Sequence, residues 1–414
     1  MPVTPWLHLF DVCGTPPFFR ILFFLMCLGV VLAIPARNYF EKPAWDVRIY
    51  LQGVDSVRAG HDPYADAIAV QRLYHDHREL FPASATTPFS YVYSPITLPI
   101  LKFVATHPLW ISGFLYWSIY AFGAFAQIWV GFQFADSKER RFFLFYVPVA
   151  AFLPGLLASD ILWSGNVAFI LYGLVLFCAV IGWRRNNWMW FYLAVIAASC
   201  VKAPLLSLLV ISPLSAPRQW LRTTAAAAVG FALFASQPLI WPSLFKHYLQ
   251  AVELQFSYNR DFGSSPAGIL SGYLFDHHIP YSPASYFFFL GYAVPVFALL
   301  LWLSRQYLRG RFSLQQWAPV LLVGVLLLNP RILEYDEIMV SAPLALILWR
   351  FCASLMPARQ AIALAVAVFF AANAIAYSSW QVWKLTEGPL LVLFFAAGVW
   401  TLLHQSNTSA RAAG

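Results

Sequence analysis

Residues 45–95 read WDVRIYLQGVDSVRAGHDPYADAIAVQRLYHDHRELFPASATTPFSYVYSP and form the long hydrophilic stretch of this chain. Five aspartates lie from Asp46 to Asp76, and Glu79 follows them. The rest of the chain is largely apolar. Of all residues 60% are hydrophobic and 11% are charged, whereas a soluble domain carries about 25% charged residues. We therefore expect an all-α polytopic membrane protein whose chemistry takes place in this one long loop.

A membrane-spanning helix needs about 20 apolar residues, and about twelve segments of the chain approach that length. They are 18–36, 108–134, 142–158, 166–183, 188–201, 204–216, 222–240, 284–304, 314–329, 337–351, 359–378 and 389–404. One set of connecting loops is basic, which predicts a cytoplasmic position, and the other set holds nearly all the acidic residues. We expect a single transmembrane domain over 1–414 with both termini inside, outer loops at 37–95 and 241–283, and a short polar tail at 405–414.

The hydrophilic loop itself carries helical periodicity. Residues 46–59 place apolar side chains on one face and charged ones on the other, and Gly60 is a typical C-terminal stop. The predicted apolar face consists of Val47, Tyr50, Leu51, Val54 and Val57. This pattern is typical of an amphipathic helix on a membrane surface. Residues 66–80 are expected to form a second such helix, with Ile68, Leu73 and Leu80 turned inward. Residues 95–106 are too short to span comfortably and are interpreted as a half-membrane or interfacial helix.

Lys202 interrupts an apolar stretch that runs from Trp188 to Ser215. The basic loops on both sides require an even number of crossings, so we expect a hairpin that turns at Lys202–Ala203–Pro204. A charge near the middle of a span costs about 2.5–3.5 kcal/mol on insertion scales, which marks it as functional. Lys202 is a candidate for binding an anionic ligand such as a lipid phosphate. The alternative is a lysine that extends to the membrane interface.

Other polar side chains could carry chemistry on the same outer side. Asp46 could accept a proton from a hydroxyl nucleophile, although a helix N-cap or first-turn aspartate is the alternative. Within 329–337, Arg331 could bind phosphate, and Glu334 and Asp336 could bind sugar hydroxyls. That segment could also be a plain solvated turn. Asn166 and Asp160 are weaker candidates, more typical of helix caps.

The sequence argues against several other classes of site. His75 and His77 are two residues apart and do not face each other on a helix, and the five cysteines share no metal-ligand spacing. No Walker A, GxSxG or HExxH motif is present. The acidic outer loops argue against nucleic acid as a partner. We therefore expect neither a metal nor another cofactor.

The order of the motifs resembles the GT-C membrane glycosyltransferases, and most closely glycosyltransferase family 87, which includes a mycobacterial phosphatidylinositol-mannoside mannosyltransferase. The resemblance covers about residues 18–350. The motifs that carry it are Asp46-x-x-x-Tyr50, Gly60-x-x-Pro63-Tyr64, Tyr91-x-Tyr93-x-Pro95, Ser164–Gly165–Asn166, Lys202-x-Pro204 before Arg218 and Arg222, and Asn329–Pro330–Arg331 before Tyr335–Asp336.

The resemblance implies an inverting, metal-independent transfer of a hexose, with mannose the best single choice, from a polyprenyl-phosphate donor to a glycolipid or glycan acceptor. It implies that Asp46 is the general base and that Lys202 and Arg331 hold the donor phosphate. The implied sugar- or acceptor-binding residues are Tyr50, Tyr64, Tyr93, Asn166, Glu334, Tyr335 and Asp336. The chain departs from the family at Asn166, where Gln is frequent, and at Arg331, where His is common. Both differences bear on the acceptor more than on the reaction.

The implied location is a bacterial inner membrane, with lipids as surroundings and the active site on the extracytoplasmic face. Two other classes of function remain open from the sequence. A transporter or flippase of lipid-linked sugars would also carry a membrane-embedded cation, but it predicts inverted repeats with paired broken helices. A non-catalytic subunit for polysaccharide assembly would keep the surface helices and tolerate the loss of Asp46.

Overall fold

The computed structural model describes residues 18, 21–22, 24–26, 28–29, 32–33, 44–82, 91–136, 139–140, 164–258, 260 and 262–413. The described part of the chain is helical, with no β-strand in it. The first expected span at 18–36 is described only in part, and the expected span at 142–158 and Asp160 lie outside the described residues. The fold class expected from the sequence, all-α, is confirmed for this part of the chain.

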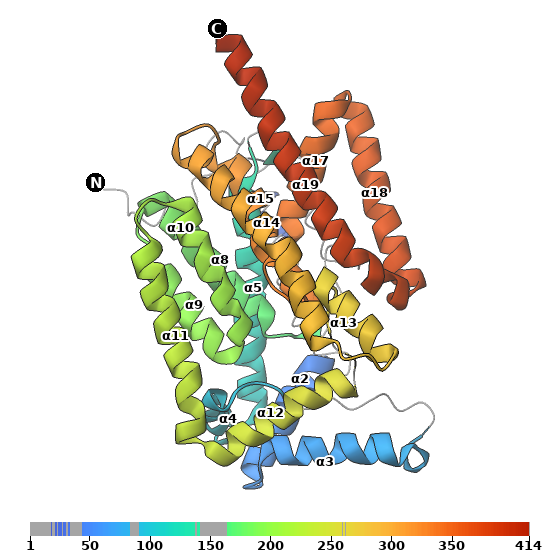
Figure 1. Ribbon diagram of the computed structural model, residues 1–414. Coiled ribbons are helices and arrows are strands. Elements are labelled where there is room, and N and C mark those ends of the chain that lie inside the picture. The colour runs from blue at the N-terminus through green and yellow to red at the C-terminus, as the bar shows by residue number, and fades with distance from the viewer. Residues whose placement is uncertain are drawn as a thin grey trace, which may run out of the picture.

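The helices follow one another along the chain, and the longer ones are labelled in Figure 1. Those of the first half are α2 (Trp45–Arg58), α3 (Pro63–Asp76), η2 (Arg78–Leu80), η3 (Pro95–Thr97), α4 (Leu98–Ala105), α5 (Leu109–Phe134), α8 (Ala168–Arg185), α9 (Met189–Val201), η4 (Ala203–Val210), α10 (Ile211–Ser215) and α11 (Trp220–Ile240). Those of the second half are α12 (Pro242–Ser257), α13 (Pro266–Asp276), α14 (Ser282–Leu308), α15 (Leu314–Leu327), α16 (Glu334–Glu337), α17 (Ser341–Leu355), α18 (Ala358–Ser378) and α19 (Trp380–Ala413).

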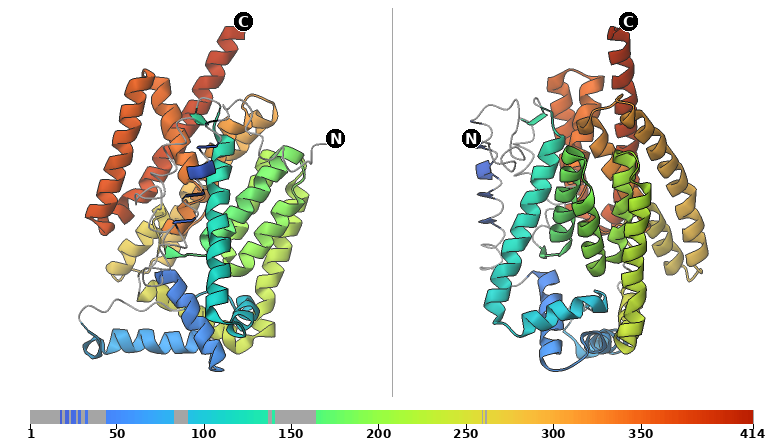
Figure 2. Two further views of the ribbon diagram at one scale, coloured as in Figure 1. Left: turned by 180° about the vertical axis from the view of Figure 1, so that it is seen from behind. Right: turned by 90° about the vertical axis from the view of Figure 1, so that its left-hand side faces the viewer.

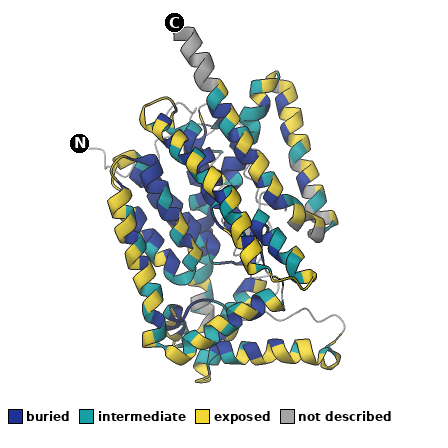
Figure 3. Cartoon of the chain, viewed as in Figure 1, coloured by how far each residue is buried: buried dark blue, intermediate teal, exposed yellow. Residues whose placement is uncertain are grey.

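Four helical segments in the described part are long and apolar enough to cross a membrane. They are Ala168–Arg185, Trp220–Ile240, Ser282–Leu308 and Leu385–His404. Large apolar side chains remain exposed on α11, α14 and α18, among them Leu239, Phe231 and Phe287 (Figure 3). A surface this apolar is suited to lipid rather than water, so the protein is a membrane protein.

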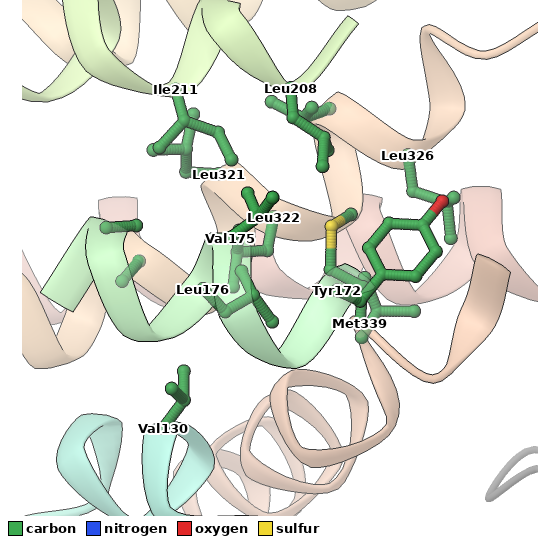
Figure 4. Packing of buried hydrophobic residues seen from close by; sticks show 14 of the residues in the cluster. Val130, Tyr172, Val175, Leu176, Leu208, Ile211, Leu321, Leu322, Leu326 and Met339 are labelled. Atoms are coloured by element: carbon green, nitrogen blue, oxygen red, sulfur yellow. The ribbon is translucent and has the colours of Figure 1, made fainter. Parts of the chain in front are cut away.

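The core is built around α8, which packs against α5 and α9. Figure 4 shows Tyr172, Val175 and Leu176 of α8 among side chains of α15 and of the η4–α10 segment. Close approach of α5 and α8 depends on glycine, because a Cβ on Gly173 would come within 2.6 Å of the Gly123 carbonyl oxygen. In a lipid environment such contacts stabilise the bundle by packing and not by exclusion of water.

The outer loop expected at 37–95 contains the predicted helices, and they gather at one end of the molecule. Helices α2, α3 and α12 lie together at the end opposite the C-terminal end of α19 (Figures 1 and 2). Helix α2 matches the predicted segment, and Gly60 follows it with φ +75°. Helices α12 and α13 fill most of the predicted outer loop 241–283. The predicted polar tail at 405–414 is part of α19 as far as Ala413.

The second predicted helix is correct in kind and wrong in its boundaries. Helix α3 begins at Pro63, three residues before the predicted start, because the Asp62 side chain accepts hydrogen bonds from the backbone N–H groups of Tyr64 and Ala65. Ile68 is buried as expected, but Leu73 and Leu80 are 44% and 66% exposed. The helix ends at Asp76, so its apolar stripe does not continue to Leu80.

At the other end of the molecule, Arg350 of α17 holds a buried glutamate. Its guanidinium lies 2.6 Å from Glu139 and donates further hydrogen bonds to the carbonyl oxygens of Phe134 and Gln315. This cluster joins the end of α5 to the start of α15 and to α17.

Candidate functional site

Asp46 is a buried carboxylate at the second position of α2. Asp46 is 4% exposed to solvent. The N-cap of α2 is Ala44, so the alternative that Asp46 caps the helix is wrong, although its first-turn position still suits the helix dipole. Among the residues that the structure describes, Oδ2 of Asp46 has no hydrogen-bond partner. A buried carboxylate oxygen that is left unsatisfied is costly, which is typical of a group kept for a ligand.

The segment 164–166 lies against the first turn of α2 and supplies partners to Asp46. Gly165 has φ +77°, and a Cβ there would come within 2.5 Å of the Val47 side chain. Only glycine permits this approach. Burial raises the pKa of Asp46 from 3.8 to about 6, against the lowering effects of a hydrogen bond with Ser164, of the Lys202 charge and of a hydrogen bond with Asn166. The carboxyl group is therefore largely ionised at neutral pH and still basic.

Lys202 reaches the same place from the break between α9 and η4. Helix α9 ends at Val201, Lys202 is extended with φ −130°, and a 3₁₀ helix begins with Ala203–Pro204. The predicted turn at this lysine is therefore confirmed, since α9 and η4 pack against each other. The Lys202 ammonium lies 3.4 Å from Oδ1 of Asn166 and 3.6 Å from the centre of the Tyr335 ring.

Asn166 combines the two roles that the sequence left open. Its Oδ1 accepts a hydrogen bond from the N–H of Ala168 at the start of α8, as a cap does. The same side chain touches the Lys202 ammonium and forms a hydrogen bond with Asp46. It therefore lies between the candidate base and the candidate cation and fixes their separation.

The segment 331–336 approaches from the second half of the chain, and its residues separate into two groups. Asp336 is buried, and its two oxygens accept hydrogen bonds from the Tyr172 hydroxyl at 2.9 Å and from the Leu333 N–H at 3.0 Å. These bonds give Asp336 a structural role, because they hold the short helix α16 against α8. Arg331 is half-buried and lies over the Phe256 ring of α12, at 5.1 Å. The side chain of Glu334 lies outside the described residues.

The three tyrosines taken as sugar-binding residues have different surroundings. The Tyr50 and Tyr93 hydroxyls are 2.8 Å apart, and the N–H of Val167 donates to the Tyr50 oxygen at 3.0 Å. Tyr64 is fully buried, and its hydroxyl donates to the backbone carbonyl of Tyr93 at 2.5 Å. Tyr64 therefore positions Tyr93, and Tyr50 and Tyr93 are the ones whose hydroxyls lie near Asp46.

The structure thus brings Asp46, Asn166, Lys202 and Tyr335 into one cluster, with Tyr50 and Tyr93 beside it. Sequence reasoning did not select Ser164, Tyr116 or Tyr172. Tyr116 donates a hydrogen bond to the Gly165 carbonyl and so holds the segment that carries Asn166. The available signal was the glycine between two polar residues at 164–166, which is typical of a backbone forced close to a neighbour.

No group of three His, Cys, Asp or Glu side chains suited to a metal ion occurs in the described part of the chain. His75 stacks on Tyr258 with ring centres 4.2 Å apart, and His77 contacts Glu79. These histidines therefore belong to the surface of α3 and its C-terminal turn.

Comparisons of the chain with protein-family models, with curated proteins and with solved structures give no match. The similarity to glycosyltransferase family 87 therefore rests on the motifs of the sequence.

Proposed function

We propose that this protein is a GT-C membrane glycosyltransferase that transfers a hexose from a polyprenyl-phosphate donor to a glycolipid or glycan acceptor. The observation that carries the proposal is the buried carboxylate of Asp46, which has an unsatisfied oxygen and lies with Lys202 on either side of Asn166. A general base and a cation held side by side meet the two needs of this reaction. The motif resemblance supplies the class of donor.

In the proposed reaction, the acceptor hydroxyl oxygen forms a bond to the anomeric carbon of the donor sugar, and its proton passes to Asp46. The bond between the anomeric carbon and the phosphate oxygen breaks, and the electron pair leaves with the polyprenyl phosphate. Attack from the opposite face inverts the anomeric centre. Lys202 stabilises the departing phosphate as its charge develops, and Arg331 is assigned a second contact with a phosphate.

The pKa of about 6 suits Asp46 to this role. A general base works best when its pKa lies close to the working pH, because it is then ionised and still accepts a proton readily. Asp55 lies on the exposed side of α2 and lacks this environment. The same helix therefore offers a matched comparison for an experiment.

We further propose that the chain crosses a bacterial inner membrane about twelve times, with both termini in the cytoplasm. The amphipathic helices then lie on the extracytoplasmic face, where a polyprenyl-phosphate sugar is presented. Support comes from the basic connections around 184–187, 216–222 and 305–311, because the positive-inside rule places such loops in the cytoplasm. The membrane lipids hold the polyprenyl chain of the donor.

The test is sugar transfer by purified protein in liposomes. Labelled polyprenyl-phosphate hexoses, mannose first, are offered with a membrane lipid extract as acceptor. Wild type, Asp46→Asn and the matched control Asp55→Asn are compared, with and without EDTA. We expect transfer by wild type and by the control, a loss of at least about 100-fold in Asp46→Asn, and no effect of EDTA.

Two results contradict the proposal in different ways. Full transfer by Asp46→Asn removes the assigned base and leaves the class of reaction standing. An absence of transfer with every donor, together with movement of label across the bilayer, favours a transporter of lipid-linked sugars.

A further inference from the structure

Tyr93 is held in a fixed place beside the candidate base. It is 9% exposed, its backbone carbonyl accepts the Tyr64 hydroxyl, and its ring packs on those of Tyr50 and Tyr91 at 5.4 Å from each. A side chain packed on both sides has little rotational freedom. Its hydroxyl oxygen therefore has one position, and the groups within hydrogen-bond distance of that oxygen can be counted.

The count leaves one phenolic hydrogen over. The N–H of Val167 already occupies one lone pair of the Tyr50 oxygen, and the Tyr50 and Tyr93 hydroxyls are 2.8 Å apart. We assign Tyr50 as the donor in this pair, so that its hydrogen lies on the Tyr93 oxygen. Tyr116, the next tyrosine, donates its hydrogen to the Gly165 carbonyl. With this assignment, the hydrogen that Tyr93 retains is in no hydrogen bond that the structure shows within the described part of the chain. A buried O–H group without an acceptor is costly unless a ligand supplies one.

The charges around this hydroxyl indicate which kind of ligand atom it can meet. Burial raises the pKa of Tyr93 well above its usual value, and the negative charges of Asp46 and Asp336 raise it further. Both carboxylates therefore interact electrostatically with the Tyr93 hydroxyl. The two carboxylates repel a phosphate oxygen at this position, whereas the positive charge of Lys202 attracts it. A neutral hydroxyl is suited to this position, because it accepts from Tyr93 and keeps its own hydrogen for a carboxylate.

We infer that Tyr93 donates a hydrogen bond to one hydroxyl oxygen of the transferred sugar and so determines which hexose the protein accepts. The inference rests on the proposed transferase function and gives it a specificity-determining residue. Tyr50 is a positioning residue in this arrangement, because it acts through the hydrogen that it passes to Tyr93. Tyr64 fixes the backbone at the same point.

The experiment measures kcat/KM for a polyprenyl-phosphate mannose donor and for its monodeoxy analogues, each lacking one sugar hydroxyl. Wild type, Tyr93→Phe and Tyr50→Phe are compared. The matched control is Tyr91→Phe, which loses a hydroxyl that is bonded to Thr97 at 2.8 Å and takes no part in the site. We expect wild type to discriminate against one analogue by about 10-fold or more. With the full sugar, kcat/KM of Tyr93→Phe should fall by about the same factor by which wild type discriminates against that analogue. With the analogue itself, Tyr93→Phe should show no further loss of kcat/KM.

Tyr50→Phe provides the second variant if Tyr93→Phe does not fold. It should show a smaller loss of kcat/KM with the full sugar and, like Tyr93→Phe, no further loss with the same analogue. Tyr91→Phe should retain the wild-type pattern. Losses in Tyr93→Phe that are equal for every donor overturn the inference and leave the transferase standing. So does an unchanged kcat/KM, which is expected if Tyr50 donates to Tyr116 and Tyr93 donates to Tyr50. No transfer by wild type with any donor refutes the transferase and the inference together.

Discussion

Replacing Asp46 by asparagine is expected to abolish activity and at the same time to stabilise the folded protein. The substitution keeps the size of the side chain and removes a charge that burial disfavours. Burial is the main cause of the raised pKa of Asp46, which outweighs the opposing effects of Ser164, Lys202 and Asn166. A catalytic carboxylate that stays ionised at a buried position lowers the free energy of unfolding, so its removal should stabilise the folded protein.

The magnitude follows from the pKa. A rise from 3.8 in the unfolded chain to about 6 in the folded protein corresponds to about 3 kcal/mol, at about 1.36 kcal/mol for each pKa unit. The sign is set by proton binding. The folded protein holds the proton more tightly than the unfolded chain, so wild type loses stability as the pH rises from about 4 to about 6. Asp46→Asn lacks this loss, and its advantage is therefore full above pH 6 and absent below about pH 4.

The assay is thermal unfolding of wild type and Asp46→Asn in a mild detergent at several pH values. We expect the variant to unfold a few degrees higher at pH 7.5, with the two midpoints converging as the pH falls towards 4. Other titrating groups are shared by both proteins, so the difference isolates Asp46. A variant that is less stable at pH 7.5, or a gain that does not change with pH, would show that Lys202 and the hydrogen bonds stabilise the ionised form. Asp46 would then not be a base whose pKa is raised by burial.

Three other substitutions have defined outcomes. Ser164→Ala removes a hydrogen bond that lowers the pKa of Asp46. The pKa of Asp46 should therefore rise, and the increase of kcat/KM with pH should move to higher pH. A pH profile identical to that of wild type contradicts this prediction. Lys202→Met should raise the KM for the polyprenyl-phosphate donor by about 10- to 150-fold, because a charge-assisted bond to phosphate is worth about 1.5–3 kcal/mol, and titration of the donor checks it. Arg350→Met leaves the buried Glu139 charge uncompensated and should cost about 3–5 kcal/mol of stability. In Arg350→Met with Glu139→Gln much of that stability should return, as followed by thermal unfolding, and recovery by the pair is the result that the ion-pair explanation requires.

Local features of the chain were predictable because they depend on neighbouring residues. The periodicity of 46–59 and the glycine after it predict α2, and the lysine–proline break predicts the end of α9 at Val201. The start of α3 was missed because it depends on Asp62, whose carboxylate caps two backbone N–H groups. The exposed Leu73 and Leu80 were missed because an apolar stripe does not indicate whether it meets protein or lipid.

The sequence by itself determined an all-helical membrane chain and identified Asp46 and Lys202 as charged residues with a candidate function in it. Only the tertiary structure decided that they share Asn166, that Asp336 is committed to Tyr172, and that Arg331 lies over α12. The reason is physical. Helical periodicity is fixed by contacts three and four residues apart, whereas Asp46 and Lys202 are brought together by the packing of α2, the 164–166 segment and α9, which no local pattern encodes.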